Sequence, residues 1–223
     1  MKRLLPSVLA AAVAGAVGLA VAGWQLLRPD RVQYEEPTYT VESSNPTFEV
    51  RAYEATLQAR VTVSGSRERA TQQGFRILAG YIFGGNQAKQ SIAMTTPVSA
   101  APQSQSIEMT APVSATASAT GWTVGFTMPR QWTLDTLPVP NDSRVQLVAV
   151  SAHRAAVRSF TGRANQARVA DEERALLGAL EALGLQANSG VTLAQFDPPW
   201  VLGPWRRNEL QVGLGGPNDV DPP

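Results

Sequence analysis

One apolar pattern in this chain has the spacing of an amphipathic helix. Its members recur three and four residues apart, so they share one helical face; they are Phe75, Leu78, Ala79 and Ile82. Ser64 or Ser66 is a candidate N-cap, and the Gly84-Gly85-Asn86 run predicts a left-handed stop. The sequence therefore predicts a helix that ends just before Gly84.

A second helix is predicted over residues 166–183, with Gly184 as its stop. Its expected inner stripe is apolar apart from one glutamate and consists of Val169, Glu173, Leu176, Leu177, Leu180 and Leu183. The neighbouring Glu172, together with Glu173, is interpreted as part of a solvated face, because adjacent helical residues point apart.

Alternation of apolar and polar residues predicts the strands, and it is clearest over Thr56–Val63. A repeated motif, residues 92–98 and 107–113, predicts two antiparallel strands joined by a polar loop. A strand pair is expected to turn near Ser151. The remaining predicted strands are Tyr39–Glu42, Phe48–Tyr53, Gly121–Met128, Arg144–Val150, Arg154–Phe160, Val191–Phe196 and Glu209–Leu214.

The order of these elements is strands, helix, strands, followed by strands, helix, strands. This order predicts two similar halves, each a curved antiparallel sheet that carries one helix. The fold class is therefore α+β.

Several separated motifs also resemble those of one known family. They are Y-I-F-G-G-N (81–86), I-A-M-T-T-P-V (92–98), E-M-T-A-P-V (108–113), F-E-V-R (48–51), L-P-V-P-N-D (137–142), F-D-P-P-W (196–200) and R-R-N-E (206–209). Together they resemble the SOUL haem-binding protein family over residues 38–214. The resemblance implies duplicated β-α-β-β units that form a distorted eight-stranded antiparallel barrel flanked by two helices.

The resemblance also implies a ligand, haem or a related porphyrin, bound non-covalently in a hydrophobic groove beside the first helix. Arg76 would pair with a propionate. Carried onto this sequence, the candidate binding residues are Phe75, Arg76, Leu78, Ala79 and Ile82. The apolar members fit the core face of a helix equally well. The family carries basic residues near the positions of Gln72 and Gly80, and neither residue is basic here.

Residues 1–31 have the pattern of an export segment. Lys2 and Arg3 precede an uncharged, mostly apolar run over residues 4–27. This run fits a cleaved signal peptide, with A-x-A at residues 20–22, and it also fits a retained membrane anchor. Either reading places the rest of the chain outside the cytoplasm, in the periplasm or another extracytoplasmic space. A linker over 32–37, a domain over 38–214 and a disordered tail over 215–223 follow.

Charge and composition argue against several classes of function. The formal charge is +1, with acidic and basic residues interspersed, so no nucleic-acid partner is expected. The chain has no cysteine, which excludes disulfides and thiolate ligands. No nucleophile–base pair is recognisable, so no catalytic residue and no metal ligand is predicted.

A few side chains are nevertheless of types that can coordinate haem iron. His153 is the single imidazole, and a surface turn is the favoured interpretation. Met94 and Met109 fit core packing better than thioether ligation, and Tyr81 fits the end of the helix.

The aromatic and basic residues near the C-terminus have two interpretations. The cluster comprises Trp200, Trp205, Arg206 and Arg207. It forms either the rim of a pocket or a loop fixed by an ion pair with Glu209, and the second is favoured.

Haem or tetrapyrrole binding for buffering or transfer is thus the function expected. An envelope interaction or structural module with the same barrel and no haem is the alternative. A small-molecule effector or hydrolase site ranks third.

Overall fold

The computed structural model describes residues 34–88, 104–198 and 200–215. Within them, nine strands pair into one antiparallel sheet in the order β1-β2-β9-β11-β10-β5-β6-β3-β8, and β4 pairs with β7. The strands of the large sheet are β1 Tyr39–Ser44, β2 Glu49–Tyr53, β3 Thr56–Val63, β5 Val113–Ser118, β6 Gly121–Thr127, β8 Gln146–Val150, β9 His153–Thr161, β10 Thr192–Gln195 and β11 Arg207–Leu214. The remaining elements are α2 Arg67–Ile82, α3 Gln166–Ala182, β4 Asn86–Gln87, β7 Val139–Pro140 and the 3-10 turn η1 Gly203–Trp205.

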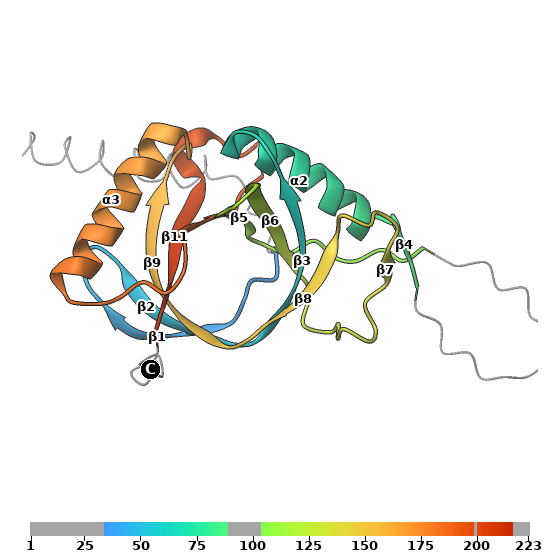
Figure 1. Cartoon of the computed structure of the whole chain (residues 1–223), viewed down its shortest axis with the longest axis horizontal. Helices are drawn as coiled ribbons and strands as arrows, with labels where there is room; N and C mark the ends of the chain where they lie inside the picture. Colours follow the sequence, from blue (N-terminus) through green and yellow to red (C-terminus); the bar gives the residue numbers. More distant parts are fainter. Residues whose placement is uncertain (1–33, 89–103, 199, 216–223) are drawn as a thin grey trace, which may run out of the picture. The chain divides into compact units, whose positions relative to one another are not determined.

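The expected duplication is present in the topology. The units β3-α2-β5-β6 and β9-α3-β10-β11 have the same order, and β5 and β10 pair to join them. β2 then pairs with β9, and β8 pairs with β3, so each unit is extended by a strand at its outer edge. These eight strands, with β1 added beyond β2, form a curled half-barrel that carries both helices on its outer side (Figure 1).

The outer face of the curled sheet is apolar and holds the helices. α2 packs on β3 and β6, and α3 packs on β9 and β11. At Gly74, α2 lies so close to β6 that a Cβ atom on residue 74 would lie 2.6 Å from Val124 Cβ. The two core clusters centre on Leu78, Ile82, Val61, Val124 and Phe126, and on Val50, Phe160, Leu176, Leu180 and Leu210.

Both helices end as the glycine positions predict. Gly84 and Gly184 have φ angles of +111° and +67°, a region that costs other residues free energy. Ser66 occupies the N-cap position of α2, although its side chain makes no capping hydrogen bond there. Asn165 caps α3 by accepting a hydrogen bond from the Arg168 amide at 2.9 Å.

The inner stripe of α3 agrees with the prediction at Val169, Leu176 and Leu180, but Leu177 is exposed and Glu172, rather than Glu173, is the buried glutamate. Glu172 is buried, accepts a hydrogen bond from Arg158 of β9 at 2.6 Å and forms an ion pair with Arg168 at 2.7 Å. The interpretation of Glu172 as solvated was therefore wrong. The reason is that an arginine on the outer face of β9 supplies a buried partner, which the helix pattern does not reveal. Leu183 lies at the C-cap and is largely exposed.

Two strand pairings expected from the sequence are wrong. β8 and β9 follow each other in the chain but do not pair with each other, because β8 joins β3 and β9 joins β2 and β11. The second copy of the repeated motif is not a strand over 107–112, since β5 begins at Val113. Ile107 is instead buried, with its amide donating to the Ile82 carbonyl at 2.8 Å. The first copy lies outside the described residues.

The predicted export segment, residues 1–31, and the predicted tail, residues 215–223 apart from Gly215, also lie outside the described part of the chain. Contacts divide the chain after Gln33 into two units, and the fold above belongs to the unit that begins at Tyr34. Among the described helices, neither is long and apolar enough to span a membrane.

Candidate functional site

The residues proposed to bind a porphyrin are all on α2, but they differ in exposure. Leu78 and Ile82 are fully buried in the core. Phe75 is half-buried and meets Phe126 edge-on, with ring centroids 5.5 Å apart. Ala79 is half-buried and Arg76 is exposed. Two of the five therefore pack α2 against the core, and the other three are at least partly accessible to a ligand on the surface of α2.

The motif that follows α2 has a structural role. The Asn86 side chain donates to the Tyr81 and Gln105 carbonyls at 2.7 and 2.8 Å, and its oxygen accepts from the Gln105 amide at 2.9 Å. The Tyr81 hydroxyl donates to the Pro138 carbonyl at 3.0 Å, and burial raises the pKa of Tyr81 to about 12. Tyr81 is therefore a neutral phenol near pH 7. Next to it, Phe83 is 64% exposed.

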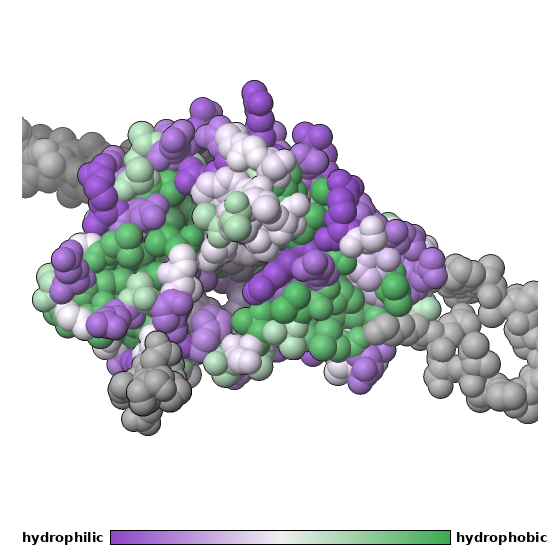
Figure 2. All heavy atoms as spheres, in the orientation of Figure 1, coloured by the Kyte–Doolittle hydropathy of each residue, from purple (hydrophilic) through white to green (hydrophobic). Residues whose placement is uncertain are grey.

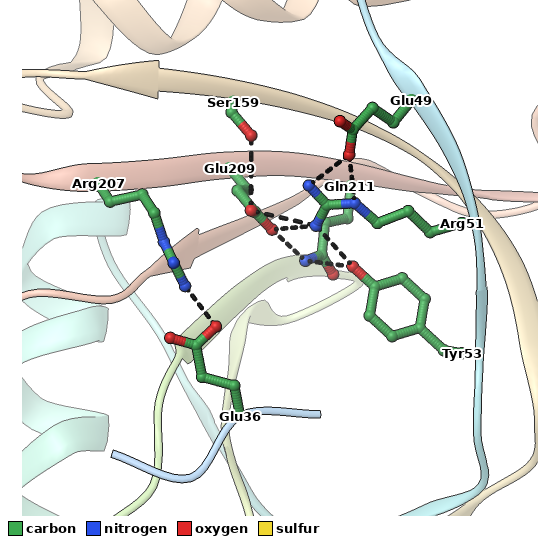
Figure 3. Close-up of polar contacts among 8 residues, drawn as sticks. All are labelled: Glu36, Glu49, Arg51, Tyr53, Ser159, Arg207, Glu209 and Gln211. Atoms are coloured by element: carbon green, nitrogen blue, oxygen red, sulfur yellow. Dashed lines mark hydrogen bonds and ion pairs between the residues drawn. The ribbon is translucent and has the colours of Figure 1, made fainter. Parts of the chain in front are cut away.

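The inner face of the sheet carries a buried charge cluster (Figure 3). The Arg51 guanidinium of β2 donates to both carboxylate oxygens of Glu209 on β11, at 3.1 and 3.2 Å. It also donates to Glu49 at 2.8 Å and to the Tyr53 hydroxyl at 3.3 Å. Gln211 donates to Glu209 at 3.1 Å. The expected pairing of Glu209 with Arg206 or Arg207 was wrong; its partner is 158 residues away in the chain.

These contacts determine the charge states of the cluster. Burial alone would lower the pKa of Arg51, but Glu209, Tyr53 and Glu49 together raise it above its ordinary value. Burial raises the pKa of Tyr53 to about 12, although Arg51 opposes that shift. Arg51 is consequently a cation and Tyr53 a neutral hydrogen-bonding neighbour over the physiological pH range, and Glu209 and Glu49 are the ion-pair partners of Arg51.

Arg207, also on β11, lies beside this cluster with a different set of contacts. Its guanidinium carbon lies 3.6 Å from the centroid of the Phe196 ring. Its terminal nitrogen donates to Glu36, and its backbone amide donates to Asp197. Its Nε is buried and has no hydrogen-bond partner among the described residues. The sequence predicted the strand only from Glu209 onward, whereas β11 begins at Arg207, and nothing in the sequence identified Glu36 as a partner.

Two cavities adjoin the inner face. The larger, of about 560 Å³, lies at the start of β3 and the ends of β6 and β8. Apolar side chains contribute much of its wall; these are Leu57, Met128, Trp132, Leu134 and Val150. Ligand sites commonly have 300–1,000 Å³. The smaller, of about 70 Å³, borders Arg51, Glu209 and Phe196. In the space-filling view, hydrophobic residues reach the surface below α2, over β3 and β8 (Figure 2).

The other candidate ligands occupy ordinary positions. His153 is exposed, with Nδ1 3.0 Å from the Ser151 carbonyl, and it stacks on Tyr53. Met109 packs against the core, and Met94 lies outside the described residues. Within the described ranges, no three His, Asp or Glu side chains gather as a metal site.

The loop between β10 and β11 is fixed in part by Arg206, which donates to the Val201 carbonyl at 2.9 Å. Trp200 is 72% exposed and Leu202 is 61% exposed in the same loop. This loop therefore presents apolar side chains outward.

Comparison with known proteins gives a family and a fold. The sequence profile of a family described as SOUL heme-binding protein matches residues 34–213. No curated protein sequence matches the chain. The C-terminal domain of EcmrR has a similar structure, with a TM-score of 0.52 and 9% identity over 79% of this chain and 98% of that one.

Two structures from Listeria innocua are also similar at low identity. A hydrolase encoded by lin2189 gives a TM-score of 0.49 at 13% identity, covering 78% of this chain and 94% of that one. A further hydrolase gives 0.47 at 14% identity, covering 87% and 98%. At such identities the likeness to solved structures concerns the fold alone.

Proposed function

Because the chain belongs to the SOUL haem-binding protein family, we propose that it binds haem or a related tetrapyrrole non-covalently, for buffering or transfer. The observation that carries the proposal is the family match over residues 34–213, which spans almost the whole described domain. We propose further that the chain is a binding protein rather than an enzyme. The exposed position of its single imidazole, His153, supports this.

The proposed site is the outer surface of α2. Phe75 and Ala79 are half-buried there, Arg76 is exposed, and Phe83 extends the apolar surface beyond the helix end. A flat macrocycle gains about 25 cal/mol for each Å² of apolar surface that it buries. An arginine beside it pairs with a propionate. Leu78 and Ile82 take the role of fixing the helix beneath the ligand.

We also propose that the protein acts outside the cytoplasm, as an exported or membrane-anchored chain. The proposal rests on the uncharged run over residues 4–27 after Lys2 and Arg3.

A haemin titration of the full-length chain, followed by absorbance, tests the binding proposal. Saturable one-to-one binding is expected, and it should weaken about tenfold in Arg76→Glu and Ala79→Glu, since both changes place a carboxylate where propionates and apolar surface would lie. Arg174→Glu on α3 is the matched control, because Arg174 is also exposed. Uptake that does not saturate, or that weakens equally in the control, would contradict the proposal.

The alternative function, a protein-interaction module without haem, has one observation in its favour. Trp200 and Leu202 expose their apolar side chains in one loop, and exposed apolar patches commonly mark interfaces. Failure of haem binding in the titration, with an intact fold, would favour this alternative.

A further inference from the structure

A short segment before β1 lies against the inner face of the sheet. Residues 34–38, here called the strap, precede β1 and appear in blue in Figure 1. The Glu35 carbonyl accepts from the Ala111 amide at 3.0 Å, and the Thr38 carbonyl accepts from the Glu54 amide at 3.1 Å. The Glu35 carboxylate accepts from the Arg130 amide at 2.9 Å and lies 3.4 Å from the Arg130 guanidinium, and most side chains of the strap are only half-buried.

The strap inserts one carboxylate, that of Glu36, at the edge of the inner charge cluster (Figure 3). Arg51 is already matched by Glu49 and Glu209. Arg207 pairs with Glu36, and its stacking on Phe196 holds the guanidinium plane in place. Without Glu36, Arg207 would remain as an oriented cation with a buried, unbonded Nε. That is the arrangement that receives a carboxylate.

The strap borders both cavities. Glu36, Pro37, Glu54, Thr56 and Thr127 line both of them. Arg207 lines neither cavity, but its partner Glu36 lines both, so withdrawal of the strap would join the apolar volume of about 560 Å³ to the position that the Glu36 carboxylate now occupies beside Arg207. A ligand that replaced the strap would then have an apolar body next to Met128 and Trp132 and an anionic end at Arg207.

We propose that the inner face is a binding site for a small apolar molecule bearing a carboxylate, and that Glu36 occupies the carboxylate position in the present structure. The strap is thus an internal competitor that the ligand displaces. The site is separate from the α2 surface and does not depend on haem binding.

The direct test measures binding of 2-naphthoate to the full-length chain by titration calorimetry. Glu36→Gln removes the competing charge but keeps the shape, so 2-naphthoate should bind about five- to tenfold more tightly. Glu42→Gln is the matched control, because the Glu42–Arg154 pair has a similar exposure on β1. Arg207→Gln should reduce 2-naphthoate binding about tenfold or more, and the neutral 2-naphthamide should bind weakly to every variant.

A second test locks the strap in place. The chain has no cysteine, so Glu35→Cys with Thr110→Cys creates one possible disulfide. The two residues are bridge partners, and adjacent strands lie about 4.8 Å apart, within disulfide range. The oxidised form should lose 2-naphthoate binding, and reduction should restore it.

Three results would overturn the proposal. They are unchanged affinity in Glu36→Gln, equal binding of the naphthoate and the naphthamide, and equal binding by the oxidised and reduced double variant. Thermal unfolding of each variant separates loss of binding from loss of fold. None of these measurements uses haem, so they are independent of the haemin titration.

Discussion

The two faces of the curled sheet are formed by the same strands but carry different side chains. On β11, Leu210, Val212 and Leu214 point to α3 and the core, whereas Glu209 and Gln211 join the charge cluster on the other face. The outer face is closed by helices, so its side chains are fixed by packing. The inner face is partly open and carries both cavities. Stability should therefore depend mainly on the outer face, and ligand chemistry on the inner face.

The largest expected effect is on the outer face. Leu78→Ala and Leu176→Ala each remove a fully buried side chain, one from each helix, and should lower the free energy of unfolding by about 3 to 5 kcal/mol. Leu183→Ala, at an exposed position, should cost well under about 1 kcal/mol. Denaturant unfolding measures all three. Similar losses at buried and exposed positions would contradict the division between faces.

The next effect concerns the buried pair of the inner face. The Arg51 and Glu209 side chains are 6% and 5% exposed. Glu209→Gln should lower the free energy of unfolding by about 2 to 4 kcal/mol, because Arg51 would keep only Glu49 as a charged partner. Arg51→Met combined with Glu209→Leu should recover much of this loss, since no buried charge remains. A double variant less stable than Glu209→Gln would contradict this explanation.

Much of this outer face was predictable from local sequence. Three- and four-residue spacing identified both helices, and alternation in β3 separated core-facing from inner residues. Gly84 and Gly184 were correctly predicted as helix stops. Such features depend on neighbours in the chain, so a single sequence contains them.

The inner face was much less predictable. Arg51 and Glu209 meet only because β2, β9 and β11 lie next to one another, and Glu36 meets Arg207 only because the strap lies against the inner face. Strand order is a long-range property, and the wrong pairing of β8 with β9 has the same origin. Glu172 was misjudged because its partner Arg158 belongs to another element. The candidate site on α2 was read from a resemblance and remains a prediction.

Each face contains one buried tyrosine whose ionisation should make the free energy of unfolding depend on pH. Tyr81 is a buried residue of α2 and Tyr53 lies in the inner cluster, and burial raises the pKa of each to about 12. An unfolded tyrosine ionises near pH 10. The stability that these groups contribute is complete below about pH 10 and is lost as the pH rises through 12, because only the unfolded chain releases the protons.

Unfolding measured between pH 8 and pH 12 tests this expectation. The free energy of unfolding should fall above about pH 10, and the fall should be shallower in Tyr81→Phe and in Tyr53→Phe. At neutral pH, Tyr81→Phe should cost about 1 kcal/mol, because the Pro138 carbonyl loses its donor. A profile that is unchanged in both variants would show that other groups cause the alkaline loss.

The smallest effect should come from the strap. The Arg207 and Glu36 side chains are 33% and 39% exposed, and ion pairs that solvent reaches contribute little to folding. Glu36→Gln should therefore change the free energy of unfolding by less than about 1 kcal/mol, similar to Glu42→Gln on β1. A loss above about 2 kcal/mol would mean that the strap is part of the folded core. A ligand could not then displace it at moderate affinity, because displacement would cost the same free energy. Near-neutral stability together with a gain in 2-naphthoate affinity is thus the combination that distinguishes a displaceable strap from a structural strand.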